Sequence, residues 1–513
     1  MDVKKSNVKL TVVGLMLGLL LAALDQTIVS TAMPTILKEF GGLDKLVWVY
    51  SAYLITSVAG MPIFGKLSDM YGRKRFYLLG LVVFMIGSAL CGTAQSMEQL
   101  ITYRAIQGIG GGALMPIVFT IIFDIFPAEK RGKMQGLFGA MFGISSVLGP
   151  LAGAFFTDYV NWRWCFYINL PLGVISFLVI TACYHESKTH VKQRIDWAGT
   201  VLMVGAILCL LFGLELGGKE YAWDSWQIVG LLGGFVVLLI AFLLTERAVA
   251  DPLISMGLFR NRLFSSSMGI AFLYGAIMIS GATYIPLFIQ GVFGGSATSA
   301  GLVLTPMMLG VVASSAIGGR FIGRLSYRNI MLGSVVLIII ALLLLGTIGI
   351  DTPRWQVTLY MIVMGLGAGT SFPVISISAL HKIPMNKRGS VNSMNQFFRT
   401  IGSAIGITIF GTIQSHQLKA GLTDIVPPQF ADQIGDGRGL LQDTVKQMFP
   451  ADAYHKLMSV LADSISYVYQ WSIVIGVLAF LFILFMGKAR MEIPAKSHVN
   501  EKAGEQPIVQ PGH

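Results

Sequence analysis

The sequence predicts an all-α membrane protein, and three observations support this. Of the 513 residues, 54% are hydrophobic and only 12% are charged, whereas about a quarter of the residues in an ordinary soluble domain are charged. So few charges cannot cover the surface of a soluble protein of this size. The apolar residues form long runs, each near the roughly 20 residues that a helix needs to cross a bilayer. The composition therefore excludes a soluble multidomain enzyme, a secreted disulfide scaffold and a disordered protein.

The apolar runs predict fourteen transmembrane helices. Backbone groups inside lipid must bond internally, so these runs are expected to be helical, and the alternating pattern of a membrane barrel is absent. The expected spans are approximately 10–32, 47–66, 76–95, 99–123, 135–157, 165–183, 197–216, 226–245, 264–290, 298–322, 330–349, 356–380, 391–413 and 466–486. The first run carries Asp25 and is too long for a signal peptide, so we expect it to be retained as a span.

The positive charges predict the orientation in the membrane. Of the 37 lysines and arginines, 26 lie in the loops and termini of one side and nine in the loops of the other, and cytoplasmic loops are the ones enriched in these residues. Both termini are therefore expected in the cytoplasm, which requires an even number of spans. The net charge of +11 fits loops that contact anionic lipid head groups rather than nucleic acid.

An internal repeat divides the chain into two related halves. The segment PAEKRG (127–132) matches PMNKRG (384–389), and at the same offset GIGGGALMP (108–116) matches GLGAGTSFP (365–373). At nearly the same offset GKLS (65–68) matches GRLS (323–326). Duplicated helical halves are typical of secondary transporters, whose site lies between the halves near the bilayer midplane.

The repeat predicts five regions. Spans 1–6 pair with spans 9–14, and spans 7 and 8 form an inserted pair. The expected regions are a cytoplasmic N-terminus 1–9, an N-terminal six-helix bundle 10–183, an inserted helix pair with its loops 184–263, a C-terminal six-helix bundle 264–486 that includes an outer loop 414–465, and a cytoplasmic tail 487–513.

The charged residues inside the spans are not shared by the two halves. Asp25 falls opposite Ala282, and Arg104 falls opposite Met361. Packing requirements are common to both halves, so charges present in one half only indicate a task beyond packing.

Several motifs of the chain resemble those of a known family. GKLSDMYGRKR (65–75) resembles the loop 2–3 signature of the major facilitator superfamily, YRAIQGIGGGA (103–113) its arginine motif in span 4, and GISSVLGPLAG (143–153) its antiporter motif in span 5. LDQTIVSTAMP (24–34), WRWCFYINLP (162–171) and the fourteen spans resemble the drug:proton antiporters of that superfamily, and multidrug exporters of Gram-positive bacteria in particular. The resemblance covers nearly the whole chain apart from the outer loop and the tail.

The resemblance implies a fold and a function. The fold would be the major facilitator fold, with two six-helix bundles and two inserted central helices. The function would be proton-driven export of amphipathic, often cationic compounds by alternating access, with antibiotic resistance as a consequence. It implies a monomeric, multi-pass protein of the cell membrane that is not an enzyme and has no cofactor. No GxxxxGK[ST] motif for a nucleotide is present, so an ion gradient is the expected energy source.

Asp25 and Arg104 are the predicted proton-coupling residues. A carboxylate in the middle of a span is costly and should face a cavity or a partner, which suits a group that takes up a proton from outside and releases it inside. Arg104 keeps its charge and is expected to modulate the proton affinity of Asp25 or of a nearby acid. The alternatives are a hydrogen-bonded structural Asp25 and an Arg104 that forms a structural ion pair or reaches the membrane surface.

Gly65, Asp69, Gly72 and Arg73 are predicted to form a gating latch between spans 2 and 3. The glycines allow a tight turn and close helix approach, and Asp69 can pair with Arg73 or with a neighbouring helix terminus. The latch would close in the outward-facing state and open in the inward-facing state. Anchoring of the topology alone would explain the basic residues but not the lone Asp69.

Gly143, Gly149, Pro150 and Gly153 form the antiporter motif that the resemblance implies. Small residues let helices approach closely, and Pro150 removes a backbone hydrogen bond from span 5. Plain helix packing remains the alternative.

The substrate pocket is expected to be apolar and aromatic. Its candidates are the polar or aromatic residues inside spans, and each taken singly also fits ordinary packing: Tyr53, Tyr274, Tyr284, Gln290 and Asn395.

Other polar groups receive minor roles. Asp124, at the inner end of span 4, and Glu215, in span 7, are acids of second rank with expected structural roles. Arg399 in span 13 has no acidic partner in the second half, so a partner in the first half is possible. The four cysteines and seven histidines show no metal-ligand spacing, and no metal site is predicted.

Other functions fit the sequence less well. A dedicated exporter of one metabolite or lipid is the alternative within the class, and transport assays with several dyes would distinguish it. An integral membrane enzyme would need His, Cys or carboxylate clusters at a membrane face. A channel is disfavoured by the duplicated halves and by the glycine-rich motifs.

Overall fold

The computed structural model describes residues 7–41, 45–126, 128–186, 196–218, 220–249, 251–294, 297–422 and 449–490. Each of the fourteen expected spans falls on helical structure in this part, although 165–183 and 356–380 are each divided between two consecutive helices. Eleven helical segments are long and apolar enough to cross a membrane by length and composition. The three remaining expected spans lie on α2 (Leu46–Tyr71), α5 (Ala128–Tyr159) and α15 (Arg388–Leu422), which are 26, 32 and 35 residues long. The all-α class is confirmed, whereas the count of fourteen spans stays a prediction at these three helices.

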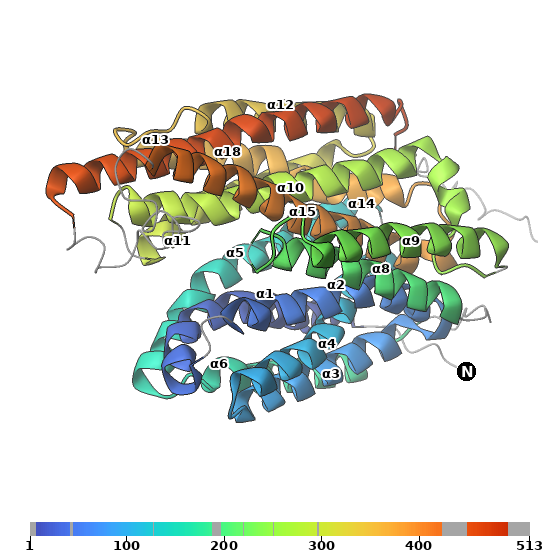
Figure 1. The fold of residues 1–513 in the computed structure, drawn as a ribbon. Helices are drawn as coiled ribbons and strands as arrows, with labels where there is room; N and C mark the ends of the chain where they lie inside the picture. Colours follow the sequence, from blue (N-terminus) through green and yellow to red (C-terminus); the bar gives the residue numbers. More distant parts are fainter. Residues whose placement is uncertain are drawn as a thin grey trace, which may run out of the picture.

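The N-terminal half forms one bundle, in the lower part of Figure 1. Within it α4 packs against both α2 and α3, and α1 packs against α5 and α7. Its helices are α1 (Val8–Phe40), α2 (Leu46–Tyr71), α3 (Arg73–Thr93), α4 (Met97–Ile125), α5 (Ala128–Tyr159), the short α6 (Trp164–Tyr167) and α7 (Asn169–Cys183).

The C-terminal half forms the second bundle, above the first in Figure 1. Here α10 packs against α15 and α18, and α13 packs against α11 and α12. Its helices are α10 (Arg262–Gly291), α11 (Ala297–Phe321), α12 (Tyr327–Leu345), α13 (Arg354–Gly369), α14 (Ser371–Ala379), α15 (Arg388–Leu422) and α18 (Ala451–Phe485), with a 3-10 turn η3 (Met385–Lys387) before α15.

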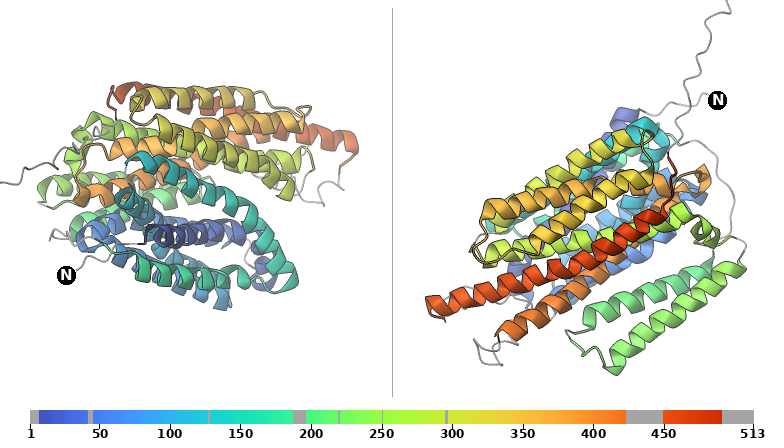
Figure 2. Two further views of the ribbon diagram at one scale, coloured as in Figure 1. Left: turned by 180° about the vertical axis from the view of Figure 1, so that it is seen from behind. Right: turned by 90° about the horizontal axis from the view of Figure 1, so that it is seen from above.

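The two inserted helices stand at the edge of the molecule. α8 (Trp197–Leu216) and α9 (Trp226–Ala248) pack against each other, and α8 also contacts α2 and α15. A 3-10 turn η2 (Met256–Arg260) leads into α10. The right-hand view of Figure 2 shows the pair beside the main bundle. α9 is strongly apolar, yet few of its residues are buried against the rest of the protein, as expected for a helix that faces lipid.

The contacts between the halves follow the sequence repeat. α2 packs against α15, and α5 packs against α11. In numbers of expected spans, the first contact joins spans 2 and 13 and the second joins spans 5 and 10. The repeat relates span 2 to span 10 and span 5 to span 13, so exchanging the two halves converts the first contact into the second. The two halves are therefore related by an approximate twofold operation, as the repeat predicts.

Side-chain caps define where many of these helices begin. Ser, Asp and Asn accept a hydrogen bond from a free backbone N–H of the first turn. The capping residues are Asn7 for α1, Ser96 for α4, Asp196 for α8, Ser225 for α9, Asn261 for α10 and Ser326 for α12.

The outer loop expected over 414–465 is shorter than predicted. α15 continues to Leu422 and α18 already begins at Ala451, while residues 423–448 lie outside the described part. Leu457, Leu461 and Ile465 are fully buried and recur at intervals of four, so one face of this helix packs inside the bundle. Hydropathy missed the segment because the polar residues of its other face interrupt the apolar run.

Candidate functional site

A buried polar network surrounds Asp25 in the N-terminal half. Asp25 is 0% exposed and Arg104 is 1% exposed. Arg104 Nη1 donates to Asp25 Oδ2 at 2.5 Å. Gln107 Nε2 and Asn169 Nδ2 both donate to Asp25 Oδ1, at 2.8 and 3.0 Å. The carboxylate of Asp25 therefore accepts three hydrogen bonds, one of them from a cation.

Close helix packing places these groups together. Gly108 and Gly112 of α4 lie so near α2 that a Cβ at either would be 2.4 Å from a backbone oxygen of α2, that of Tyr53 or Ser57. Gly110 lies equally close to α3, with a Cβ position 2.3 Å from the nitrogen of Phe84. The glycine run after the span 4 arginine is therefore required by packing.

Further contacts fix the guanidinium of Arg104. Its Nε donates to the carbonyl of Val49 at 3.3 Å, and its Nη1 also donates to Gln107 Oε1 at 2.7 Å. The guanidinium carbon lies 4.5 Å from the ring centroid of Tyr53. Arg104 is thus an ion-pair partner of Asp25 and does not reach the membrane surface, and its role in proton coupling stays a prediction.

Asn169 extends the network to α3 and leaves one polar atom unsatisfied. Its Nδ2 also contacts Ser88 Oγ at 2.9 Å, and Ser88 donates to the carbonyl of Phe166 at 2.8 Å. Asn169 Oδ1 is buried and has no hydrogen-bond partner among the described residues. A protonated Asp25 would carry an O–H that needs an acceptor, and a turned Asn169 amide could provide one.

The sequence did not single out Ser88, Gln107 and Asn169. Gln107 follows Arg104 by three residues on α4 and so shares its helix face, which was a usable signal. Asn169 lies inside WRWCFYINLP, the motif quoted above only as part of a resemblance. Ser88 carries no sequence signal that distinguishes it from the other serines in spans.

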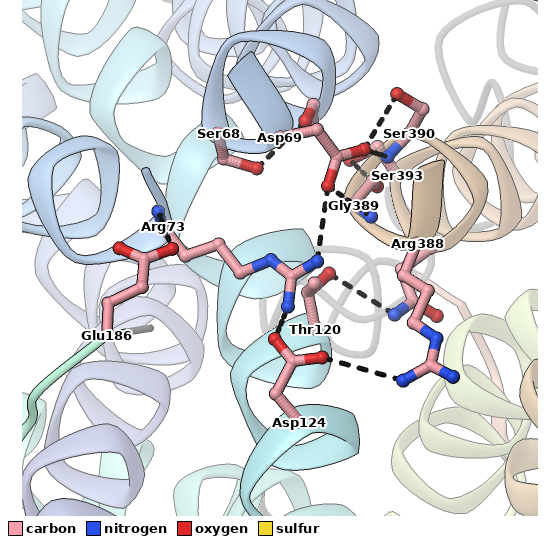
Figure 3. A network of polar contacts seen from close by, with 12 residues as sticks. Ser68, Asp69, Arg73, Thr120, Asp124, Glu186, Arg388, Gly389, Ser390 and Ser393 are labelled. Carbon is pink, nitrogen blue, oxygen red and sulfur yellow. Dashed lines mark hydrogen bonds and ion pairs between the residues drawn. The ribbon is translucent and has the colours of Figure 1, made fainter. Parts of the chain in front are cut away.

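A second polar network joins the two halves at the end of α2. Asp69 Oδ1 accepts from the backbone N–H of Gly389 at 2.9 Å, and Asp69 Oδ2 accepts from the N–H of Ser390 at 2.7 Å and from its hydroxyl at 3.0 Å. These N–H groups belong to the first turn of α15, so Asp69 caps a helix of the opposite half (Figure 3). A carboxylate there also interacts favourably with the helix dipole.

Arginines complete this second network. Arg73 Nη2 lies 3.3 Å from Asp69, and Arg73 also forms an ion pair with Asp124 of α4. Arg388 of α15 lies 3.7 Å from Asp124. Figure 3 shows these charges side by side. The structure thus brings two of the predicted latch residues, Asp69 and Arg73, together with Asp124, which the sequence ranked only second.

Glycines permit the close approach of the halves at this network. A Cβ on Gly65 would lie 2.0 Å from the hydroxyl of Ser393, and a Cβ on Gly389 would lie 2.5 Å from Asp69. Gly72 joins α2 to α3 with φ of 110°, a backbone conformation that favours glycine. The four residues predicted for the latch therefore lie at one end of the interface between the halves.

The antiporter-motif glycines seat α5 against α1. A Cβ on Gly149 would lie 2.0 Å from the hydroxyl of Thr27, and one on Gly153 would lie 1.9 Å from that of Thr31. Pro150 lies inside α5, and Gly143 lies on the same helix. These contacts fit the packing alternative, and they join the motif to the helix that carries Asp25.

The predicted substrate residues do not form one cluster. Tyr53 lies under Arg104 in the N-terminal half, and the hydroxyl of Tyr274 bonds Ser334 Oγ at 2.9 Å inside the C-terminal half. Tyr284 is buried farther along α10, and Gln290 is partly exposed near the end of that helix. Asn395 of α15 donates to Ser376 at 3.3 Å. Whether any of them binds substrate stays a prediction.

A third charged group lies at the other end of the N-terminal half. Glu39 accepts from Arg163 Nη2 at 2.9 Å and from the indole N–H of Trp162 at 2.6 Å. The hydrogen bond from Arg163, followed by that from Trp162, holds the pKa of Glu39 below its ordinary value. This pair fastens the end of α1 to the segment before α6. Glu215 lies partly exposed near the end of α8.

Among the described residues, no group of three or more His, Cys, Asp or Glu side chains is placed to hold a metal ion. All four cysteines are free thiols.

Comparison with known proteins identifies the family. The family model described as "Major Facilitator Superfamily" matches residues 15–407. The chain belongs to the major facilitator superfamily. It is therefore a multi-pass membrane transporter and not an enzyme, as its sequence predicted.

Two curated relatives from Bacillus subtilis (strain 168) match this chain over almost their whole length. The chain is 49% identical over 500 residues to "Multidrug resistance protein 3", which covers 96% of this chain and 98% of the relative. It is 36% identical over 526 residues to "Multidrug transporter protein MdtP", which covers 98% of this chain and 96% of the relative. The predicted resemblance to exporters of Gram-positive bacteria is confirmed.

A solved structure shares the major facilitator fold. The chain superimposes on the crystal structure of the human organic anion transporter MFSD10 (TETRAN) with a TM-score of 0.61 and 15% sequence identity, covering 93% of this chain and 100% of that one. At this identity the likeness concerns the fold alone.

Proposed function

We propose that this transporter is a drug:proton antiporter of the cell membrane. It exports amphipathic, often cationic compounds, works as a monomer and has both termini in the cytoplasm. The names of the two bacterial relatives support multidrug export. The asymmetry of lysine and arginine between the loops supports the orientation.

The buried Asp25–Arg104 pair is the observation that carries proton coupling. The ionised carboxylate of Asp25 accepts from Arg104, Gln107 and Asn169. Protonation removes the negative charge, so it weakens the charge-assisted hydrogen bond from Arg104. A proton on Asp25 therefore changes the interactions among α1, α4 and α7. Such a change in the contacts between helices can link proton movement to conformation.

The Asp69 network supports alternating access. Its contacts tie the end of α2 to the start of α15, at the end of the interface that the loop charges assign to the cytoplasm. Opening to the cytoplasm requires Asp69 to leave the N-terminus of α15. The proposed cycle therefore has two switches, the protonation of Asp25 and the release of Asp69.

Dye transport into everted membrane vesicles tests the proposal. Vesicles with the wild-type chain should accumulate several unrelated cationic dyes when their lumen is acidified. Asp25→Asn keeps the size of the side chain but cannot take up a proton at this site, so it should lower this accumulation by about tenfold or more. The measurement is the initial rate of dye uptake at a fixed pH gradient.

Glu215→Gln is the matched control, because it removes a carboxylate from the inserted pair rather than from either bundle. It should leave the rate within about twofold of wild type. The proposal would be contradicted if dye uptake by wild-type vesicles did not depend on the pH gradient, or if Asp25→Asn kept the wild-type rate of uptake. Transport of a single compound would favour the dedicated exporter instead.

A further inference from the structure

Arg399 is a cation of the C-terminal half that neither network uses. It lies on α15, within the span expected over 391–413. Its Nε is buried and has no hydrogen-bond partner, and no described acidic residue forms an ion pair with its guanidinium. The partner in the first half that its sequence position allowed is therefore not found in the part of the chain that the structure describes.

The surroundings of Arg399 place it at the seam between the halves. Its guanidinium carbon lies 4.0 Å from the ring centroid of Phe372, on α14. One turn earlier on α15, Gln396 Nε2 lies 3.8 Å from the sulfur of Met115, on α4 of the other half. One turn earlier again, Asn392 donates to Thr120 of α4 at 3.2 Å. This face of α15 therefore points toward the N-terminal half, and Arg399 continues it toward the middle of the membrane.

The backbone around Arg399 is held in place. A Cβ on Gly275 would lie 2.1 Å from the carbonyl oxygen of Arg399, so α10 and α15 touch here. Ser403 donates both to the carbonyl of Gly275 at 3.0 Å and to that of Arg399 at 3.1 Å. The arginine is thus presented from a packed and rigid part of its bundle, as a preorganised binding group should be.

An unpaired guanidinium at this depth is costly. Charged residues inside a membrane protein pair with one another or mark the path of a substrate. Arginine binds carboxylates through two parallel hydrogen bonds, and its flat face stacks on aromatic rings. Arg399 stays positively charged and contacts an aromatic ring on one side, so the partner that its guanidinium lacks is an anion.

We propose that Arg399 binds the carboxylate, or another anionic group, of the transported compound. The inference rests on the proposed export function and names a substrate class for it. The transporter then accepts amphipathic aromatic acids and zwitterions, in which Phe372 contacts the ring system and Arg399 the anionic group. Compounds that carry only positive charge form no favourable contact with Arg399, so this residue does not raise their affinity.

A matched pair of dyes tests this assignment. Rhodamine B carries a free carboxylate, and rhodamine B ethyl ester has the same ring system without it. We would measure the binding of both dyes by fluorescence anisotropy to the full chain in lipid nanodiscs. Arg399→Gln should weaken the binding of rhodamine B by about tenfold, as expected for loss of one charge-assisted contact, and change the binding of the ester by less than about twofold.

Two further variants separate binding from folding. Arg399→Lys keeps the charge without the fork, so it should recover part of the affinity for rhodamine B. Arg328→Gln removes another arginine whose Nε is buried and unpartnered among the described residues, in the first turn of α12, and should leave both dyes unaffected. Equal loss for the two dyes, no loss for rhodamine B, or no binding of rhodamine B to the wild type would overturn the inference.

Failure of the proposed function looks different. Proton-driven transport of the ester with no role for Arg399 would remove only this inference. If wild-type vesicles move neither dye under a pH gradient, the antiporter proposal itself fails.

Discussion

Arg104 contributes more than a charge to the network around Asp25. Two of its nitrogens make hydrogen bonds, Nη1 to Asp25 and Gln107 and Nε to the carbonyl of Val49. Its flat face also lies over the ring of Tyr53. A lysine has one ammonium group and cannot reproduce this combination. Charge and shape can therefore be tested separately at this residue.

We predict that Arg104→Lys keeps pH-driven dye transport but lowers its rate by about tenfold, because the ion pair survives without the additional contacts. Arg104→Gln should lose the pH response, because Asp25 then has no cation to pair with. The initial rate of dye uptake into everted vesicles measures both effects. An Arg104→Lys variant with an unchanged rate would mean that the guanidinium is only a structural partner.

At the scale of helices, the contact of Asp69 with α15 joins elements that lie far apart in the sequence. Gly389 and Asp69 are separated by 320 positions. A carboxylate at the first turn of a helix satisfies free N–H groups and meets the positive end of the dipole. Glu186 does the same within the N-terminal half, where it accepts from the backbone N–H groups of Arg73 and Lys74 at 2.8 and 3.2 Å. Of these two helix caps, only that of Asp69 crosses between the halves.

We predict that Asp69→Asn opens the cytoplasmic end, because the amide loses the charge that favours the N-terminus of α15. A cysteine placed at Thr120, in a background without the four native cysteines, should react about tenfold faster with a membrane-impermeant maleimide added from the cytoplasmic side. Glu186→Gln weakens a cap within one half and should leave that rate within about twofold. Equal rates in the two variants would show that Asp69 does not control opening.

At the scale of the whole molecule, the sequence was sufficient for the architecture. The apolar runs located the helices, and the repeat predicted two related halves, although it did not say which helices would pair across them; the structure shows α2 against α15 and α5 against α11. The asymmetry of charge also pointed to Asp25 and Arg104. Long helices and repeats are periodic, so they can be recognised without knowing which helix neighbours which.

The partners of the charged residues were not accessible in this way. Gln107 and Asn169 are ordinary amides until packing brings α4 and α7 to Asp25. For Asp69 the sequence allowed Arg73 or a neighbouring helix terminus as partners, and both are found, but no local pattern encodes that the terminus is that of α15. The extension of α18 to Ala451 was missed because its amphipathic first turns lack a continuous apolar run.

The central proposal is that Asp25 carries the proton exchanged for the drug. Proton release on dye binding tests it most directly. Purified chain in weakly buffered detergent would be mixed with a cationic dye at a series of pH values while a pH indicator reports released protons, and the largest release in the series would be compared between variants. The wild type should release about one proton for each dye bound, and Asp25→Asn should bind the dye without release. Equal release from both proteins, or none from the wild type, would contradict the claim.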